Sequence, residues 1–448
     1  MKKNPNNPRT PLLEKGGVQS VISSLIAIFL GLVFGAVILL VTGLLSSNIS
    51  SRGLWEGFRL VFLGIFCTGR DSVGNLVFGF NPTQFGNMLF RATPILMTGL
   101  SVAVAQKTGL FNIGASGQYL MGTAATLYLA LAIPSSVVPA WLIWILAFLG
   151  GMLAGALWGA IPGLFKAKFN INEVITCIMT NWIAAALVTW FFDEAVPFLK
   201  NSEEYGKAGL IKKTVANGVV TPKFGLDKIF PGSQVNGGIL IAVVLAVLMY
   251  ILLFKTTFGF RLRCCGSNRH AAKYAGINDN ASIVISMALA GALAAAGASL
   301  YWLSGNTEFT WTTYQTVPAE GFNGIPVALL ASSNPIACVF TACFMSMLNV
   351  NGLQLKSLTP FNEYITDIII ASIVYLSAFA LLIKLILGKL RKNREAKAEA
   401  QPKSEEVEEI ETEVSFAEPS VPAGTDATEN AEEPAVRQPD GEDGKGVD

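Results

Sequence analysis

Residues 257–277 read TFGFRLRCCGSNRHAAKYAGI, and they lie between two long apolar segments, Gly238–Phe254 and Ala281–Leu303. Each segment is long enough to cross a lipid bilayer, which takes roughly 17–25 mainly apolar residues. The stretch between them is basic, so we expect it to face the cytoplasm. It also carries small residues at helical spacing, which suits close docking against another protein. The sequence therefore predicts a membrane protein with a short cytoplasmic helix that contacts a soluble partner.

The composition of the whole chain agrees with a membrane protein. Of the 448 residues, 52% are hydrophobic and 14% are charged, whereas an ordinary globular domain has about 25% charged residues. The net charge of +1 hides an uneven distribution, because 17 of the 31 acidic residues lie after Leu390. The remainder is therefore basic, as expected for a membrane domain with positive cytoplasmic loops.

About ten apolar segments could cross the membrane, so we expect an all-α, polytopic integral membrane protein. These segments are Val21–Leu45, Phe85–Gln106, Gly114–Ile133, Ala140–Phe165, Val174–Phe192, Gly238–Phe254, Ala281–Leu303, Gly321–Ala331, Pro335–Val350 and Tyr364–Leu387. The first exceeds the roughly 7–15-residue apolar region of a signal peptide, so we expect it to be retained. Gly321–Ala331 and Pro335–Val350 are short for a full crossing, so we expect either one to be a broken or re-entrant helix.

The basic loops indicate an orientation. If the N-terminal segment, residues 1–20, is cytoplasmic, all strongly basic short loops fall on one side of the membrane, as the positive-inside rule requires. These loops are the turn at Lys107, the turn at Lys166 and Lys168, Lys255–Asn280 and Lys389–Lys397. The outer loops are then Ser46–Gln84, Asp193–Asn236 and Ser304–Glu320. We therefore expect a transmembrane domain over residues 21–390 and both termini in the cytoplasm.

Residues 391–448 differ in composition from the rest of the chain. They begin with basic residues, continue with glutamates between Glu405 and Glu413, and end rich in Pro, Ala, Gly and Asp. Such a segment buries too little apolar surface to offset the entropy of the chain. We expect a disordered cytoplasmic tail, which either has no specific role or binds a partner.

Two polar motifs interrupt the apolar segments, Gly109–Tyr119 and Glu320–Pro326. In each motif a Phe–Asn pair precedes a helix of small residues. Corresponding interruptions in two halves of a transporter indicate a substrate site near the middle of the membrane. The alternative is that the glycines pack helices and the asparagines cap them. A third polar residue, Asn181, lies two turns into a helix that Asn172 and Glu173 are predicted to begin, and it could contact substrate or only a neighbouring helix.

From these motifs we predict a set of substrate-binding residues that combine an aromatic ring with carboxamide groups. The set is Phe111, Asn112, Gln118, Asn181, Phe322 and Asn323. An asparagine offers a donor and an acceptor, which fits the edge of a nucleobase or the hydroxyls of a ribose.

Other classes of function find little support in the sequence. The six cysteines show no metal-ligand spacing and His270 is the single histidine, so we expect neither a metal site nor an enzyme. The chain has no Gly-x-x-x-x-Gly-Lys-Ser/Thr motif, so we expect it to bind no cofactor and any ATP to be hydrolysed elsewhere. A secondary transporter would need an ionisable residue at membrane depth. The candidates are Arg91, Glu173 and Glu320, and all are expected near the ends of spans.

Four motifs together resemble those of bacterial ABC-transporter permeases for nucleosides and simple sugars. Leu110–Gln118 is similar to the family's FNIGxEGQ, with Ser116 where many relatives carry Glu. Asn172–Asn181 resembles NEVIxTIMxN, and Gly321–Leu330 resembles GFxGIAVALL. Gly266–Ile277 looks like the coupling segment GxNPxAAxxAGI, with Arg in place of the usual Pro at 269. The matches run in family order from about residue 90 to residue 335.

The resemblance implies a subunit of an importer in the bacterial cytoplasmic membrane, closest to the longer of two nucleoside permeases that form a heterodimer. The implied partners are a second permease, a cytosolic ATP-binding subunit and an extracellular substrate-binding lipoprotein, and no nucleic acid. The residues implied to contact the ATP-binding subunit are Gly266, Asn268, Arg269, Ala271, Ala272, Ala275, Gly276 and Ile277. We expect nucleosides to be moved by alternating access. The alternatives are a secondary transporter or an ABC importer of a simple sugar such as ribose.

Overall fold

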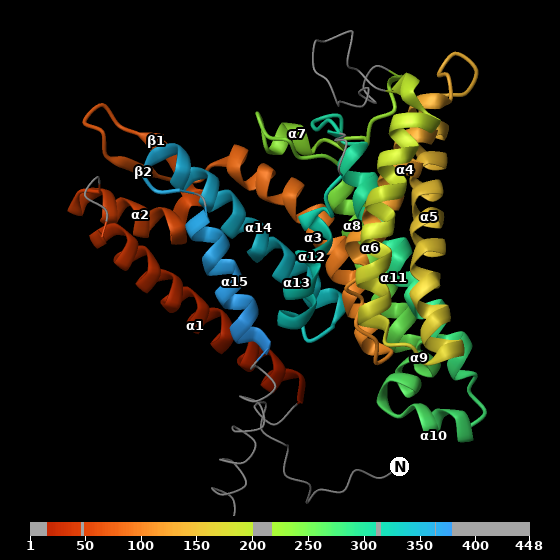
Figure 1. The fold of residues 1–448 in the computed structure, drawn as a ribbon. Coiled ribbons are helices and arrows are strands. Elements are labelled where there is room, and N and C mark those ends of the chain that lie inside the picture. The colour runs from red at the N-terminus through yellow and green to blue at the C-terminus, as the bar shows by residue number, and fades with distance from the viewer. Residues whose placement is uncertain (1–15, 46–48, 200–216, 311–314, 363, 379–448) are drawn as a thin grey trace, which may run out of the picture. The chain divides into compact units, whose positions relative to one another are not determined.

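Helices make up most of the chain that the computed structural model describes (Figure 1). The described residues are 16–45, 49–199, 217–310, 315–362 and 364–378. The predicted tail, residues 391–448, and most of the N-terminal segment lie outside them. The prediction of an all-α membrane protein is confirmed, apart from one short hairpin in which β1 (Cys67–Arg70) pairs with β2 (Leu76–Phe78) in antiparallel register.

The helices follow one another in an order that matches the predicted apolar segments. They are α1 (Gly16–Leu45), α2 (Ser51–Leu63), α3 (Pro82–Lys107), α4 (Ala115–Ala132), α5 (Ala140–Phe169), α6 (Glu173–Trp190), α7 (Leu226–Ile229), α8 (Gly238–Lys255), α9 (Thr257–Ser267), α10 (Arg269–Tyr274), α11 (Asp279–Trp302), α12 (Ala319–Phe322), α13 (Gly324–Leu330), α14 (Pro335–Leu358) and α15 (Tyr364–Ala378). A 3₁₀ turn, η2 (Gly64–Phe66), follows α2, and a π-helical turn, η3 (Phe191–Ala195), and a 3₁₀ turn, η4 (Pro197–Leu199), follow α6.

Within the described residues, seven helices are long and apolar enough to cross a membrane, namely α1, α3, α5, α6 with its π-helical turn, α8, α11 and α14. Helix α4 is not among these seven, and most of its residues are buried against α5, α6 and α11. The expectation that Pro335–Val350 is short is wrong, since α14 continues without a break to Leu358. The expectation for Gly321–Ala331 is confirmed, because this segment is broken at Asn323 into α12 and α13.

Asparagine caps begin several of these helices where the sequence predicts a start. The Asn172 side chain accepts a hydrogen bond from the Val174 N–H at 2.9 Å, and α6 begins at Glu173. The Glu173 carboxylate pairs with Lys166 at 3.0 Å, which joins the start of α6 to the end of α5. The side chain of Asn81 caps α3 in the same way and is followed by Pro82 at the first helical position, where proline is favoured.

A stripe of glycines allows α5 to approach α11 closely. Gly151, Gly155, Gly159 and Gly163 recur every four residues along α5 and therefore share one face. A Cβ atom on Gly291 of α11 would collide with the carbonyl oxygen of Gly155 and would lie 3.2 Å from the Cα atom of Gly159. Small residues of this kind drive helix association in lipid, where dispersion contacts replace the hydrophobic effect. Helices α4 and α6 complete this group.

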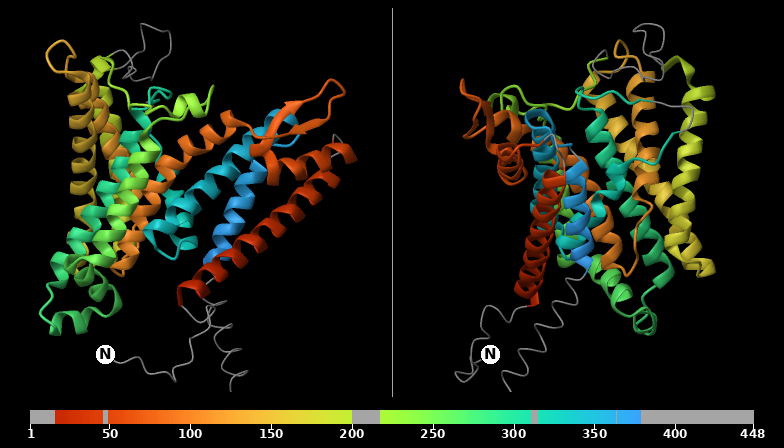
Figure 2. Two further views of the ribbon diagram at one scale, coloured as in Figure 1. Left: turned by 180° about the vertical axis from the view of Figure 1, so that it is seen from behind. Right: turned by 60° about the vertical axis from the view of Figure 1, so that its left-hand side comes forward.

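The remaining helices pack around α14. Helix α14 contacts α2, α3 and α8, and α1 lies beside α15 (Figure 2). Glu56 of α2 is 8% exposed and pairs with Arg70 at 2.6 Å and with Arg52 at 3.0 Å, which fixes α2 to the hairpin. The hydrogen bond from Arg70 is the main cause that holds the pKa of the Glu56 carboxyl below its ordinary value.

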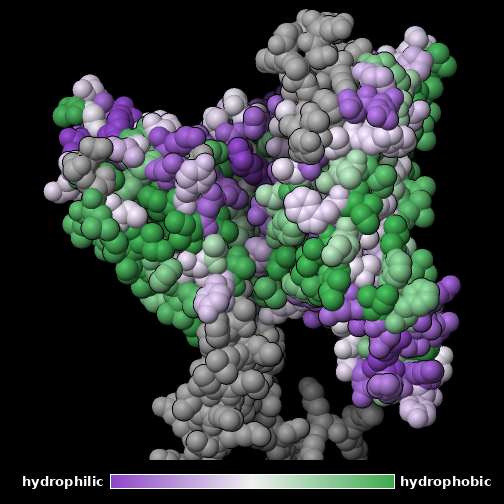
Figure 3. Space-filling model, viewed as in Figure 1, coloured by the Kyte–Doolittle hydropathy of each residue, from purple (hydrophilic) through white to green (hydrophobic). Residues whose placement is uncertain are grey.

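The surface of the molecule separates by polarity. Figure 3 shows hydrophobic surface across the sides of the long helices and hydrophilic surface over α9 and α10. Figures 1 and 2 place α9 and α10 past the end of the long helices. This arrangement is that of a polytopic membrane protein with a polar segment held beyond the apolar zone.

Candidate functional site

Two of the predicted substrate residues, Asn112 and Gln118, form a buried pair of carboxamides. The Asn112 Nδ2 atom donates to the Gln118 Oε1 atom at 2.8 Å, and the Gln118 Nε2 atom donates back to the Asn112 Oδ1 atom at 3.1 Å. Asn112 Nδ2 also donates to the Ser101 hydroxyl of α3 at 2.9 Å. Both carboxamides are at most 1% exposed. The pair therefore joins the loop before α4 to α3 and to α4 itself.

Asn181 of α6 extends this cluster. Its Oδ1 atom accepts a hydrogen bond from the backbone N–H of Gly117 at 2.8 Å, and its Nδ2 atom donates to the carbonyl of Ile113 at 3.1 Å. The two helices are so close that a Cβ atom on Gly117 would lie 2.7 Å from the Asn181 Oδ1 atom. We call Ser101, Asn112, Gln118 and Asn181 the amide cluster. Its carboxamides hydrogen-bond one another and the backbone in this conformation. They therefore join helices, which is the alternative to substrate binding that the sequence left open.

The second predicted motif lies against the first. A Cβ atom on Gly321 would collide with Ser116, the second residue of α4. Ser116 is fully buried, and its hydroxyl has no hydrogen-bond partner among the residues that the structure describes. A Cβ atom on Gly324 would lie 2.6 Å from the backbone nitrogen of Gly99 in α3. The two Phe–Asn motifs, more than 200 residues apart in the sequence, are therefore held next to each other by backbone contacts.

Asn323 lines a polar pocket of about 110 Å³ at the break between α12 and α13. The other lining residues come from α3, α11, α12 and α14 and are Arg91, Pro94, Ile95, Tyr301, Glu320 and Asn349. All five polar residues are half-buried. We call this the polar pocket. Of the predicted phenylalanines, Phe322 is 39% exposed, and Phe111 packs partly buried against the largest hydrophobic core.

Sequence reasoning did not assign Arg91, Tyr301 or Asn349 to a site. Arg91, which was expected near the end of a span, belongs to α3. Helix α3 begins at Pro82, so Arg91 lies about 14 Å along its axis at 1.5 Å per residue. An arginine well inside an apolar helix is itself a sign of function, and that signal was present in the sequence. Tyr301 and Asn349 gave no such signal, because aromatic and amide residues also pack in ordinary cores.

The implied coupling segment, Gly266–Ile277, forms the end of α9 and all of α10, with a sharp turn at each end of α10. The Asn268 side chain accepts a hydrogen bond from the Ala271 N–H at 3.0 Å. At the other end, the Ile277 N–H donates to the Ala272 carbonyl at 3.0 Å, with Gly276 at a φ of 78°. This is the Schellman motif, in which glycine adopts the left-handed conformation without strain.

Arg269, which replaces the family's usual proline, attaches α10 to α11. Its Nε atom pairs with Asp279 at 2.6 Å and its guanidinium donates to the Asn280 side chain at 3.0 Å. The small residues of α10 do not all share one environment. Ala272 is 4% exposed, whereas Ala271 and Ala275 are exposed. The surface open to a partner thus consists of Ala271, Ala275 and the neighbouring turn, and Ala272 belongs to the chain's own packing.

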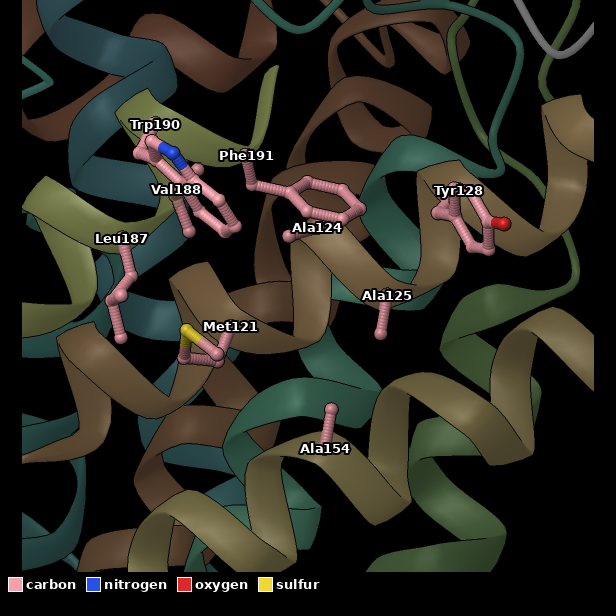
Figure 4. Close-up of a pocket in the computed structure, with 9 residues that line it drawn as sticks. All are labelled: Met121, Ala124, Ala125, Tyr128, Ala154, Leu187, Val188, Trp190 and Phe191. Atoms are coloured by element: carbon pink, nitrogen blue, oxygen red, sulfur yellow. The ribbon is translucent and has the colours of Figure 1, made fainter. Parts of the chain in front are cut away.

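A second pocket, of about 350 Å³, is almost entirely apolar (Figure 4). It lies between α4, α5 and α6 and is lined by Met121, Ala124, Ala125, Tyr128, Ala154, Leu187, Val188, Trp190 and Phe191. It contains none of the predicted site residues. In the described part of the chain, no group of three or more His, Cys, Asp or Glu residues is placed to hold a metal ion.

Known proteins match this chain over much of its length. The family described as "Branched-chain amino acid transport system / permease component" matches residues 84–379. The guanosine ABC transporter permease protein NupP of Bacillus subtilis (strain 168) is 33% identical over 82% of this chain and 96% of NupP. The nucleoside ABC transporter permease protein NupB of Lactococcus lactis subsp. cremoris (strain MG1363) is 32% identical over 83% of this chain and 94% of NupB. The glucose ABC transporter permease protein TsgB13 of Haloferax volcanii is 30% identical over 65% of this chain and 76% of TsgB13. No solved structure matches the chain.

Proposed function

This chain belongs to the family of branched-chain amino acid transport system permease components, and from that membership we propose that it is the membrane-spanning subunit of an ABC importer for nucleosides. The observation that carries the proposal is the similarity to NupP and NupB, which extends over at least 94% of both relatives. The family is one of transport permeases rather than enzymes, and the chain is a multi-pass membrane protein.

The proposed complex contains a cytosolic ATP-binding subunit, a second permease that is a paralogue of this chain, and an extracellular substrate-binding lipoprotein. The proposed orientation places both termini and the α9–α10 segment in the cytoplasm of a bacterial cell. This chain binds no cofactor, and its partner hydrolyses the ATP. The exposed face of α10, with Ala271 and Ala275, supports docking there, because a partner helix can approach small side chains closely.

The proposed mechanism is alternating access. A solute delivered from outside enters between the two permease subunits and is held by the polar pocket that contains Asn323 of the second Phe–Asn motif. Closure of the ATP-binding subunits then moves α9 and α10. That movement passes to the amide cluster through the backbone contact of Gly266 with Gly109. Two arrangements of rigid parts are sufficient for such a cycle, and substrate acts only through its differential affinity for them.

A direct test is uptake by the assembled complex. The chain is co-expressed with the proposed ATP-binding subunit, second permease and lipoprotein from its source organism, and proteoliposomes are loaded with ATP. We expect labelled guanosine, adenosine and uridine to enter only with hydrolysable ATP. A second candidate, import of a simple sugar, is favoured by the match to TsgB13. Labelled ribose and glucose are therefore measured in parallel, and uptake of a sugar without any nucleoside would reject the nucleoside proposal.

A further inference from the structure

We propose that the polar pocket recognises the base of the transported nucleoside and selects 6-oxopurines such as guanine and hypoxanthine. This inference rests on the proposed function and adds a binding site and a preferred substrate to it. It is carried by five half-buried side chains of four helices, namely Arg91, Tyr301, Glu320, Asn323 and Asn349.

The pocket contains two opposite charges inside an apolar domain. Arg91 belongs to a spanning helix, α3, and Glu320 belongs to the broken segment packed against α3. Ionisable groups inside a transmembrane domain are costly and are retained where they bind a solute or another charge. Both residues lie in the described part of the chain, and no ion pair there joins them to each other. Their hydrogen-bonding groups therefore face the pocket rather than being consumed by mutual pairing.

The walls of the pocket are held firmly. The carbonyl of Glu320 accepts a hydrogen bond from the Thr98 hydroxyl at 3.0 Å. The ring of Tyr301 stacks on Phe90 with centroids 5.5 Å apart and an interplanar angle of 23°. A recognition site needs such supporting contacts, because loosely held side chains give little selectivity.

The position of the pocket suits a solute arriving from outside. Arg91 is about 24 Å along α3 from Lys107, and Lys107 lies at the end that contacts α9. The pocket is thus in the half of α3 away from the proposed cytoplasmic segment. Figure 3 shows hydrophilic surface in the hollow between the α14–α15 side and the α4–α6 side of the molecule.

The chemistry of the pocket matches the edges of a 6-oxopurine. A guanidinium carries only donors and binds the O6 and N7 acceptors of guanine in a bidentate pair. A carboxylate carries only acceptors and binds the N1–H, and in guanine also the N2 amino group. Asn323 and Asn349 each add a donor and an acceptor for the remaining polar atoms. The two charges cancel, so the site favours a neutral solute that has a donor edge beside an acceptor edge.

Other nucleosides match these groups less well. Adenine presents an N6 amino donor to the guanidinium where guanine presents an acceptor, and its N1 atom is an acceptor that would face the carboxylate. Pyrimidines lack the N7 atom. The site therefore predicts that guanosine and inosine are preferred over adenosine and uridine.

The test compares selectivity across variants of this chain in the assembled complex, with the same lipoprotein throughout. Initial uptake of labelled guanosine and adenosine is measured for the wild type, Arg91→Gln and Glu320→Gln, with complex quantified by blue-native electrophoresis. We expect the ratio of guanosine to adenosine uptake to fall about tenfold or more in each variant, which is the discrimination of one bidentate pair. Arg59→Gln, at an arginine of α2 packed over Phe78, is the matched control and should keep the wild-type ratio.

If Arg91→Gln and Glu320→Gln impair assembly of the complex, a variant that keeps the positive charge still tests the inference. Arg91→Lys retains the charge but loses the bidentate geometry, so we expect the same fall in the ratio. An equal loss for guanosine and adenosine, or an unchanged ratio in all assembled variants, would overturn the inference while nucleoside import itself still stands. A wild-type complex that imports sugars and no nucleoside would overturn both the inference and the proposed function.

Discussion

Gly109 and Gly266 touch backbone to backbone, so neither position has room for a side chain. A Cβ atom on Gly109 would lie 3.1 Å from the Cα atom of Gly266, and a Cβ atom on Gly266 would lie 2.8 Å from the backbone nitrogen of Gly109. Gly109 also has a φ of 75°, which disfavours any other residue. The contact connects α9 directly to the loop that carries Asn112.

We expect Gly266→Val to weaken both packing and coupling. The added side chain must displace the backbone of the Lys107–Gly109 turn, and overpacking of this kind costs typically about 1–3 kcal/mol. Thermal unfolding of the purified complex and substrate-stimulated ATPase activity measure the two effects. Ser267→Val, at an exposed neighbour, is the control and should behave as the wild type. Full ATPase stimulation in Gly266→Val would show that the movement of α9 reaches the membrane by another route.

The two alanines of α10 should respond differently to arginine. Ala275 is exposed, so Ala275→Arg should leave the chain folded in the membrane and prevent binding of the ATP-binding subunit by steric hindrance. Ala272 is buried, so Ala272→Arg should lower the amount of folded chain itself, because an unpaired charge would be buried. Blue-native electrophoresis of the chain alone and of the complex separates the two outcomes.

Val137→Arg provides a control for the arginine itself, because Val137 is 77% exposed in the loop between α4 and α5. We expect that variant to assemble and to transport. Normal uptake by Ala275→Arg would reject docking at α10.

The two predicted asparagines should also separate into structural and functional residues. Asn112→Leu leaves the buried groups of Gln118 and Ser101 without their partner, at a cost of about 1–3 kcal/mol for each unsatisfied group. We expect less assembled complex and a lower melting temperature. Asn323 lines the polar pocket, so Asn323→Leu should assemble normally and lower nucleoside uptake several-fold. The reverse pattern, with Asn112→Leu stable and inactive, would place the substrate at the amide cluster.

The Glu56 ion pairs predict a dependence of stability on pH. Because the pKa of Glu56 is lowered in the folded chain, its contribution is present above the unfolded carboxyl pKa of about 4.3. That contribution is lost as the pH falls through the folded pKa. We expect Glu56→Gln to lower stability at pH 7 by about 1 kcal/mol, a small value because Arg52 and Arg70 are partly exposed.

The difference between this variant and the wild type should shrink toward pH 3. Thermal unfolding in detergent across that range measures it, and Glu194→Gln, at an exposed glutamate after α6, is the control. A difference that stays constant from pH 7 to pH 3 would contradict the assignment to the ionised carboxylate.

Apolar runs and caps were sufficient to predict most of the fold. Asn172 marked the start of α6, and the Gly–Pro pattern around Asn323 marked the break between α12 and α13, because both signals act within a few residues. The length of α14 was missed because Asn349, Asn351 and Lys356 lower the apolar character of its second half, whereas Asn351 is buried by packing on α2 and donates to the carbonyl of Val61.

The arrangement of the site was predictable only in part. The sequence identified Asn112 and Asn181 as polar residues that need partners, but not that Asn112 binds Ser101 and Gln118 or that Asn181 binds the backbone before and within α4. The polar pocket forms where α3, α11, α12 and α14 pack together. No pattern within a short stretch of sequence predicts which helices will be neighbours. The same is true of α10, where spacing alone does not distinguish buried Ala272 from exposed Ala275.

The glycine stripe of α5 restricts how this protein can move. Because Gly155 and Gly291 bring two backbones into contact without intervening side chains, α5 and α11 have no layer of flexible atoms along which to slide. We therefore expect the two helices to move together as one rigid body. Movement during transport must then come from bending at hinges elsewhere in the chain. The break between α12 and α13 at Asn323 is one such hinge. It lies in the wall of the polar pocket, so bending there would change the shape of the pocket at the same moment.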